Sequence, residues 1–187
     1  MSSMTIEPAN PAWPDDFVVL KRAVLRAAPA GAIIHHIGST AVPGLPAKDV
    51  IDIQLTVDDL DQVDRAAVEA QGFAGHPGLA GDHCPPGLDL PEAELRKLFF
   101  RSTGRAAHLH VRERGRFNQR FPLLCRDFLR AHPVAAGAYA LIKQRLMQRF
   151  PDDADAYYDI KDPVFDIIIE GANDWAMLVG WSPPPGD

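Results

Sequence analysis

Cysteine is scarce in this sequence, with only Cys84 and Cys125 among its 187 residues. The two form neither a Cys-x-x-Cys motif nor a disulfide framework, so we expect two free thiols. Long apolar runs are absent too, and the N-terminus lacks the basic, apolar and small-residue series of a secretory signal. Because a bilayer-spanning helix needs about 20 apolar residues, the sequence predicts a cytoplasmic protein without a membrane partner.

Positive charge is also in short supply, because 19 lysines and arginines face 25 aspartates and glutamates, for a net charge of −6. A protein that binds duplex nucleic acid neutralises phosphates with a basic surface, so the composition argues against a nucleic-acid partner. The basic residues nevertheless crowd into the segment 96–130. This uneven distribution is compatible with a local site for an anionic ligand.

The N-terminal part of the chain alternates between helical and strand patterns. Residues 15–28 carry apolar side chains at helical spacing after an Asp-Asp start, which predicts an amphipathic helix. Residues 32–37 are largely apolar and residues 50–57 alternate apolar with polar side chains, which predicts two strands. Glycines and prolines make 38–48 a structured loop between these strands. A second helix, capped by Asp58, is expected to follow.

The rest of the chain predicts a loop, a hairpin and a helical region. Residues 74–91 are rich in glycine and proline, which is typical of a mobile surface loop. Residues 96–101 and 107–113 read as the two strands of a hairpin. Helices are then expected from Phe117, from Pro133 and from Asp162-Pro163, where Asp162 serves as the cap. These patterns together predict an α/β (α+β) fold, with a small mixed sheet, flanking helices and a C-terminal helical half.

The densest polar cluster follows the first expected strand. A strand that ends in Gly38-Ser39-Thr40 directs backbone N–H groups and a hydroxyl toward a phosphate, and glycine permits the close approach. Asp52 lies on the polar face of the next strand, so pairing of the two strands points its carboxylate toward the same phosphate through a magnesium ion. The alternative is a tight turn beside a solvent-exposed Asp52.

A resemblance to a known family lies in the run His36-Ile37-Gly38-Ser39-Thr40-Ala41-Val42-Pro43-Gly44-Leu45-Pro46-Ala47-Lys48, followed by Ile51-Asp52-Ile53. This run resembles the signature of the GrpB family, an uncharacterised protein family. Further matching residues are Pro11-Ala12-Trp13, His108-Leu109-His110-Val111, Arg126-Asp127-Phe128-Leu129-Arg130-Ala131-His132-Pro133, Tyr139, Lys143, Tyr158 and Lys161. Because the resemblance covers about residues 10–178, we expect residues 1–187 to form a single GrpB-like domain.

The resemblance implies a nucleotidyltransferase-like fold. In that superfamily a Gly-Ser pair follows one strand, and two carboxylates on the next strand hold two metal ions. Gly38, Ser39 and Asp52 match three of these places. Gln54 stands where the second carboxylate is expected, and an amide is a poor magnesium ligand compared with a carboxylate.

Histidines replace the further carboxylate that the superfamily carries on a later strand. His108 and His110 share one face of their strand, and with His36 and Asp52 they are candidate ligands of a transition metal. The alternative is that neutral imidazoles donate hydrogen bonds to a phosphate. His35 lies on the opposite face of its strand from His36, and we expect it to be structural or exposed.

Basic side chains are candidate phosphate ligands. Lys48 is expected to neutralise charge beside the loop. Arg126 and Arg130 lie four residues apart on one helix, and a guanidinium fork suits phosphate or carboxylate. The alternative is a solvated face on which Arg126 or Arg130 pairs with Asp127 or Glu113. Secondary candidates of the same kind are Lys143 and Lys161.

Two functions from different classes follow from these residues. The first is a nucleotidyltransferase-like protein that binds a nucleotide or other phosphorylated small molecule, with Asp52 as catalytic residue. Asp52 and His110 would then hold a divalent metal ion, which could be magnesium, manganese or zinc. The second is a non-catalytic GrpB-type module with a degenerate metal site that assists folding or assembly of a partner such as a dephospho-CoA kinase. We expect Gly38-Ser39 to open onto a pocket lined by Asp52 and at least one of the imidazoles of His108 and His110.

Overall fold

A computed structural model describes residues 5–187 of the chain. The helices and strands follow one another as α1 (Trp13–Leu25), β1 (Ile33–Ile37), β2 (Ile51–Val57), α2 (Arg65–Ala70), β3 (Phe73–Gly75), β4 (Lys97–Ser102), β5 (Ala107–Glu113), α3 (Phe117–Ala131), α4 (Pro133–Arg149), α5 (Ala154–Lys161) and α6 (Pro163–Val179). The strands predicted at 32–37, 50–57, 96–101 and 107–113 are therefore confirmed to within one residue at each end.

Five strands form one mixed sheet in the order β1-β2-β5-β4-β3. β2 and β5 run parallel, whereas the other neighbouring strands are antiparallel. The parallel pairing places Asp52 opposite His108 and Gln54 opposite His110. This arrangement confirms the expected small mixed sheet and the expected hairpin of β4 with β5.

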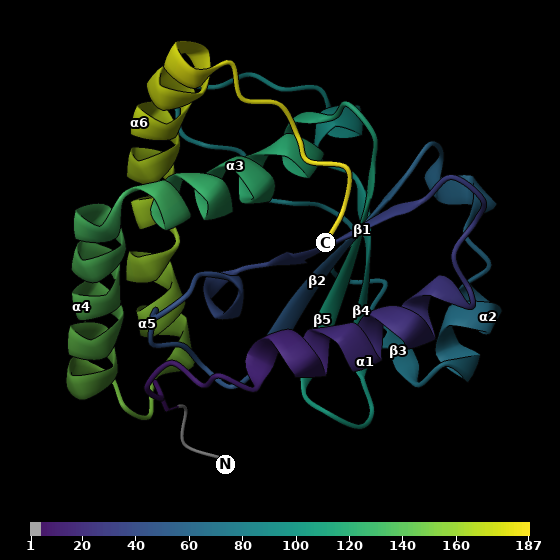
Figure 1. Ribbon diagram of the computed structural model, residues 1–187, viewed down its shortest axis with the longest axis horizontal. Coiled ribbons are helices and arrows are strands. Elements are labelled where there is room, and N and C mark those ends of the chain that lie inside the picture. Colours follow the sequence, from purple (N-terminus) through teal and green to yellow (C-terminus); the bar gives the residue numbers. More distant parts are fainter. Residues whose placement is uncertain (1–4) are drawn as a thin grey trace.

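The two faces of β2 have different neighbours, because side chains alternate along a strand. Ile51, Ile53 and Leu55 are fully buried and belong to a core cluster with Trp13 and Phe17 of α1. The intervening polar side chains lie on the opposite face, which α3 crosses (Figure 1). The alternation in β2 thus separates an apolar core from a polar face that is available to a site.

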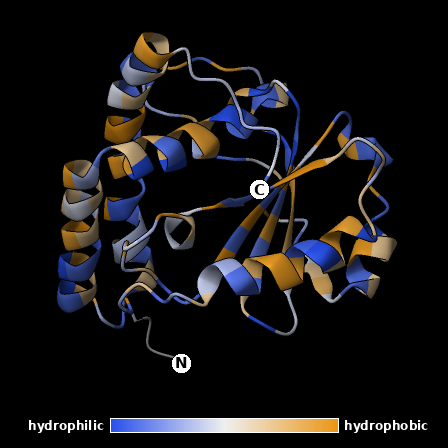
Figure 2. Ribbon diagram, in the orientation of Figure 1, coloured by the Kyte–Doolittle hydropathy of each residue, from blue (hydrophilic) through white to orange (hydrophobic). Residues whose placement is uncertain are grey.

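The helices α3 to α6 enclose further apolar clusters beside the sheet (Figure 1). Leu129 and Tyr139 from α3 and α4 bury Val42 and Leu45 of the loop 38–48. The colours along these helices alternate between hydrophobic and hydrophilic residues, as expected for elements with one covered face (Figure 2). The C-terminal helical half is confirmed, and it holds the loop 38–48 in place.

The ends of two predicted helices differ from expectation. α1 begins at Trp13 rather than at residue 15, because Pro14 fits the first turn of a helix, where its missing N–H costs nothing. α6 begins at Pro163 as predicted, but the Asp162 side chain does not cap it. The Asp162 carboxylate instead accepts a hydrogen bond from Lys161 Nζ at 2.8 Å.

The second predicted helix is largely replaced by shorter elements. Residues 60–62 form a single 3-10 turn, and only Arg65–Ala70 is α-helical. Asp64, not Asp58, caps α2 by accepting a hydrogen bond from the Ala67 N–H at 3.0 Å. Asp58 pairs with Arg114 instead. The prediction of the cap was wrong because several aspartates in this segment suit that position equally well.

Several short elements were not predicted from the sequence. β3 is only three residues long and joins the edge of the sheet beside β4. α5 has no long apolar repeat of its own, and a 3-10 turn over Ser39–Ala41 interrupts the loop 38–48. Such short elements depend on tertiary contacts rather than on local periodicity.

Both cysteines are free in the structure, as expected. Burial raises the pKa of the Cys125 thiol to about 12, so this group stays protonated at neutral pH. None of the helices within residues 5–187 combines the length and apolar character needed to cross a lipid bilayer.

Candidate functional site

A cavity of about 650 Å³ lies between the polar face of the sheet, the loop 38–48 and the helices α3 to α5. Its lining includes Gly38, Ser39 and Thr40 from the loop and Asp52 from β2. His108 and His110 of β5 line it too, as do Lys48, Lys143 and Lys161. The expected pocket at the Gly38-Ser39 turn is therefore present.

Gly38 is packed directly against Asp52. Its φ of +70° lies in the region that favours glycine, and a Cβ at this position would overlap Asp52 Oδ2. The glycine therefore brings the backbone before Ser39 into contact with one oxygen of the carboxylate. This contact explains the need for glycine at the end of β1.

The other oxygen of Asp52 faces the two imidazoles of β5. His108 Nδ1 lies 3.2 Å from Asp52 Oδ1, and His110 Nε2 lies 3.9 Å from the same atom. The three side chains offer ligand atoms that all lie within 4.8 Å of one another. The expected proximity of Asp52 to the imidazoles is confirmed, and the parallel pairing of β2 with β5 is its cause.

The protonation states of this cluster follow from burial and hydrogen bonding. Burial opposes the charge of Asp52, but the hydrogen bond from His108 and the nearby ring of His110 outweigh it and hold the pKa of the carboxyl well below its ordinary value. Burial, assisted by the positive charge of Arg112, lowers the pKa of His110 to about 4. At neutral pH the cluster therefore contains a charged carboxylate beside a neutral His110.

Gln54 is engaged at both ends of its amide. Its Oε1 accepts a hydrogen bond from Arg112 Nη1 at 2.7 Å, and its Nε2 donates to the Gln119 carbonyl at 2.9 Å. The side chain is fully buried and does not line the cavity. An amide held in this way supplies no ligand to a cation, so these residues do not fit a pair of magnesium ions held by two carboxylates.

Asp82 is a partly buried acid that the sequence did not single out. Its carboxylate accepts hydrogen bonds from Arg112 Nε at 2.7 Å and from Lys97 Nζ at 2.6 Å. Burial opposes its charge, but the field of Arg112 holds the pKa of Asp82 well below its ordinary value. No sequence pattern pointed to Asp82, because it lies in the segment 74–91, which had been predicted as a mobile loop.

Lysine side chains form a further wall of the cavity, which Lys48, Lys143 and Lys161 line. Lys143 Nζ donates to Ser39 Oγ at 2.9 Å, and burial together with Lys161 lowers its pKa to about 7. Lys48 Nζ donates to Tyr158 Oη at 2.9 Å, and the same two causes lower its pKa to about 8. Positive charge is thus concentrated around Ser39 at some electrostatic cost.

Three predicted ligand residues lie outside the cavity. His36 is buried, where its ring stacks on Phe17 with centroids 4.8 Å apart, and its Nε2 lies 2.9 Å from Thr40 Oγ1. Burial lowers the pKa of His36 to about 4, so the ring is neutral at pH 7. His36 was expected to contact a ligand, but its ring lies outside the cavity, where its Nε2 supports the loop from behind.

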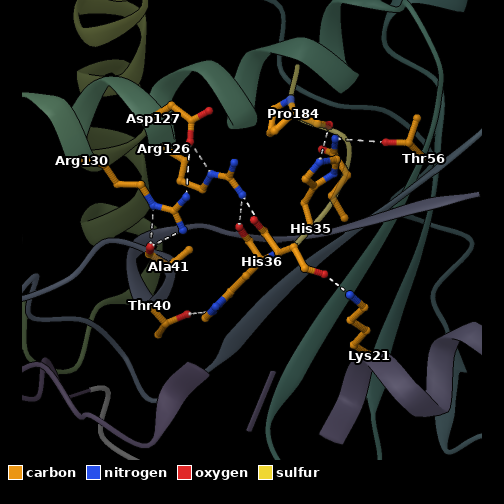
Figure 3. A network of polar contacts seen from close by, with 12 residues as sticks. Lys21, His35, His36, Thr40, Ala41, Thr56, Arg126, Asp127, Arg130 and Pro184 are labelled. Atoms are coloured by element: carbon orange, nitrogen blue, oxygen red, sulfur yellow. Dashed lines mark hydrogen bonds and ion pairs between the residues drawn. The ribbon is translucent and has the colours of Figure 1, made fainter. Parts of the chain in front are cut away.

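Arg126 and Arg130 also serve the loop rather than the cavity (Figure 3). Arg126 Nη1 donates to the His36 carbonyl at 2.8 Å, and Arg126 Nε pairs with Asp127. Arg130 donates through Nε and Nη2 to the Ala41 carbonyl at 3.0 and 2.8 Å. Neither guanidinium lines the cavity, where a ligand role was expected. Both pair with Asp127, as the alternative predicted, but Arg126 is buried rather than part of a solvated face.

Comparison with known sequences places the chain among related proteins. The family model described as GrpB protein matches residues 3–170. A dephospho-CoA kinase of Mycolicibacterium paratuberculosis is 35% identical over 94% of this chain and 47% of its own length. A UPF0157 protein of Streptomyces coelicolor is 32% identical over 81% of this chain and 75% of the relative. The chain thus spans about half the length of the dephospho-CoA kinases that it matches.

Two solved structures are similar in three dimensions. The crystal structure of the conserved protein GrpB from Enterococcus faecalis has a TM-score of 0.75 and 26% identity, and the match covers 91% of this chain and 99% of that chain. A cytoplasmic RNA terminal U-transferase has a TM-score of 0.48 and 15% identity, over 77% of this chain and 43% of that chain.

Proposed function

The chain belongs to the GrpB family, and we propose that its cavity binds a nucleotide or another phosphorylated small molecule with a phosphate beside Ser39. The observation that carries this proposal is the lysine wall. Lys143 contacts Ser39 directly, and Lys48 and Lys161 line the same cavity. Ammonium groups and a hydroxyl around one space are the donors that a phosphate requires.

The lowered pKa values support an anionic ligand. Buried Lys143 and partly buried Lys48 both lose solvation and experience the charge of their neighbour Lys161, so the protein holds these cations together unfavourably. A bound phosphate would offset that cost and raise both pKa values. The same side chains would gain nothing from a neutral ligand.

Dependence on a metal ion is a separate part of the proposal. The residues do not fit a magnesium pair, since Gln54 is tied to Arg112 and Gln119. Asp52, His108 and His110 do fit a single divalent ion with mixed oxygen and nitrogen ligands, such as manganese or zinc. Such an ion would neutralise ligand charge beside Asp52.

A thermal-shift panel tests the proposal. The panel pairs nucleoside triphosphates and coenzyme A precursors with magnesium, manganese, zinc or no metal, and a ligand at 100 times its Kd should stabilise by about 2.7 kcal/mol. Lys143→Met should abolish the shift, whereas Arg149→Met, at an exposed position on α4, should retain it. Absence of any shift across the panel would contradict the proposal.

A second candidate function is a non-catalytic module that assists folding or assembly of a partner such as a dephospho-CoA kinase. Two observations favour it: the matched region forms less than half of each such relative, and Gln54 removes one carboxylate from the site. The test is the refolding yield of a dephospho-CoA kinase with and without this protein. Asp52→Asn should leave any such assistance unchanged, whereas it should impair the binding function.

A further inference from the structure

Arg101 of β4 is an exposed cation that lines the cavity. Within residues 5–187 its guanidinium forms no hydrogen bond or ion pair, and its Cζ lies 5.8 Å from the centroid of the Phe99 ring. Its cross-strand neighbours are Ala74 and His108, neither of which is an acid. The five N–H donors of this guanidinium are therefore available to a bound molecule.

The remaining cations of the cavity differ from Arg101 in this respect. Each of them donates a hydrogen bond to another group of the protein: Lys48, Lys97, Arg112, Lys143 and Lys161. Lys97 lies on the same face of β4 as Arg101, because the two are four residues apart on a strand, but Lys97 pairs with Asp82. Arg101 is thus the cation of the described lining whose charge has no internal acceptor.

Strand pairing places Arg101 far from the end of β1. Asp52 pairs with Ile37 on one side and with His108 on the other. His108 in turn pairs with Arg101. Adjacent strands lie about 4.8 Å apart, so the Cα atoms of Ile37 and Arg101 are separated by three strand spacings, or roughly 14 Å. An anionic group held by Arg101 is therefore distinct from the phosphate proposed beside Ser39.

Tyr158 of α5 connects Arg101 with the lysines. Lys48 Nζ donates to Tyr158 Oη at 2.9 Å and lies 4.2 Å from the centroid of its ring. Burial raises the pKa of the Tyr158 hydroxyl, whereas the charges of Lys161 and Arg101 lower it. The field of Arg101 thus acts on the same group that Lys48 contacts. Positive charge therefore extends from the lysines past Tyr158 to Arg101.

We propose that Arg101 is a specificity-determining residue, which binds a second phosphate group of the same ligand through its guanidinium fork. The inference rests on the proposed function, because the first phosphate is the one beside Ser39. A chain of phosphates that extends from Lys143 past Lys48 would contact Arg101, whereas a monophosphate beside Ser39 would contact the lysines alone. The ligand class is therefore a molecule with a chain of two or more phosphates.

Isothermal titration calorimetry of the full chain with inorganic phosphate, pyrophosphate and tripolyphosphate tests the role of Arg101. We expect tripolyphosphate to bind the wild-type protein at least about tenfold more tightly than phosphate, the size of one charge-assisted hydrogen bond. Arg101→Met should remove this advantage. Its Kd for phosphate should change less than about twofold, because 0.15 M salt screens charges beyond about 8 Å. Arg65→Met, at an exposed position on α2 outside the cavity, is the control and should retain the advantage.

The outcomes distinguish a failure of the proposed function from a failure of the role of Arg101. Wild-type protein that binds neither these anions nor any panel compound contradicts the proposed function. Binding of phosphate or a panel compound without an advantage for tripolyphosphate overturns only the role of Arg101. Retention of the advantage in Arg101→Met overturns it too. An equal loss of affinity for phosphate and tripolyphosphate in that variant has the same consequence, because a general field would then replace a second subsite.

Discussion

At the scale of single residues, the position of the Asp52 carboxylate depends on one glycine. Gly38 has a φ of +70°, and its missing side chain leaves room for Asp52 Oδ2. Gly44, in the same loop, has a similar φ of +76°, but an added Cβ there would meet no atom within 4 Å. Substitution of Gly44 would therefore strain only the backbone, whereas substitution of Gly38 would also cause a collision with Asp52.

We predict that Gly38→Ala destabilises the protein more than Gly44→Ala does. In both variants the free energy of unfolding falls by roughly 1–2 kcal/mol, because alanine must adopt a left-handed conformation. Gly38→Ala must also displace the Asp52 carboxylate, which should add about 1 kcal/mol or more, within the usual cost of overpacking. Urea unfolding of the two variants measures the difference. Equal losses would mean that Asp52 moves aside freely.

Asp52→Asn distinguishes a functional from a structural carboxylate. Among the described residues, its hydrogen-bond partner is the His108 imidazole of β5, not the backbone of residues 38–40. We therefore expect the free energy of unfolding without ligand to fall by only about 0.5–1 kcal/mol, close to the range of exposed substitutions. Ligand-dependent stabilisation should be lost. A drop of about 3 kcal/mol without ligand would assign Asp52 to structure.

At the scale of elements, the segment 74–91 acts as part of the sheet rather than as a free loop. Asp82 anchors it to β4 and β5 through Lys97 and Arg112, and Asn118 of α3 donates to the same carboxylate at 3.0 Å. Arg112 in turn holds Gln54 and His110. The segment 74–91 therefore orients the side chains of Gln54 and His110 indirectly, through Arg112.

Replacing Asp82 should be far more costly than replacing an exposed acid. Asp82→Asn leaves the buried Arg112 without its counter-ion, which should reduce the free energy of unfolding by about 3 kcal/mol. Asp61→Asn removes an exposed partner of Arg96 and should cost less than about 0.5 kcal/mol. Denaturant unfolding of both variants at pH 7 provides the test. Similar losses in the free energy of unfolding would show that the pairing of Asp82 with Arg112 contributes little to stability.

At the scale of the whole molecule, the cavity exists because segments far apart in the sequence meet. Lys48 comes from the loop before β2, Lys143 from α4 and Lys161 from α5. A chain with a net charge of −6 thereby encloses a locally positive space. The overall charge says little about the ligand, because field strength depends on nearby groups and their burial.

This assembly predicts a pH dependence of both stability and binding. The pKa of Lys143 is about 7 in the folded protein and 10.5 when unperturbed, so the unfolded state binds more protons between these values and stability should rise with pH there. Phosphate binding should raise the lowered pKa and take up a proton. Affinity should therefore fall roughly tenfold from pH 6.5 to 8.5. Calorimetry at several pH values measures this fall, and Lys143→Met should remove most of it.

The sequence by itself determined the local features. Alternation in 50–57 predicted β2 and placed Asp52 on its polar face, and the run 36–48 indicated the loop and the family. These features follow from the period of a strand and from the backbone freedom of glycine, so neighbouring residues suffice to define them.

Only the tertiary structure decided which of the polar residues share the cavity. Arg126 and Arg130 turned toward the loop backbone, because the face of a helix that is covered depends on what packs against it. Asp82 entered the cluster, and Lys143 became a central residue of the site, through contacts across many residues of sequence. Long-range pairing and burial therefore settled the chemistry of the site, since no local pattern specifies them.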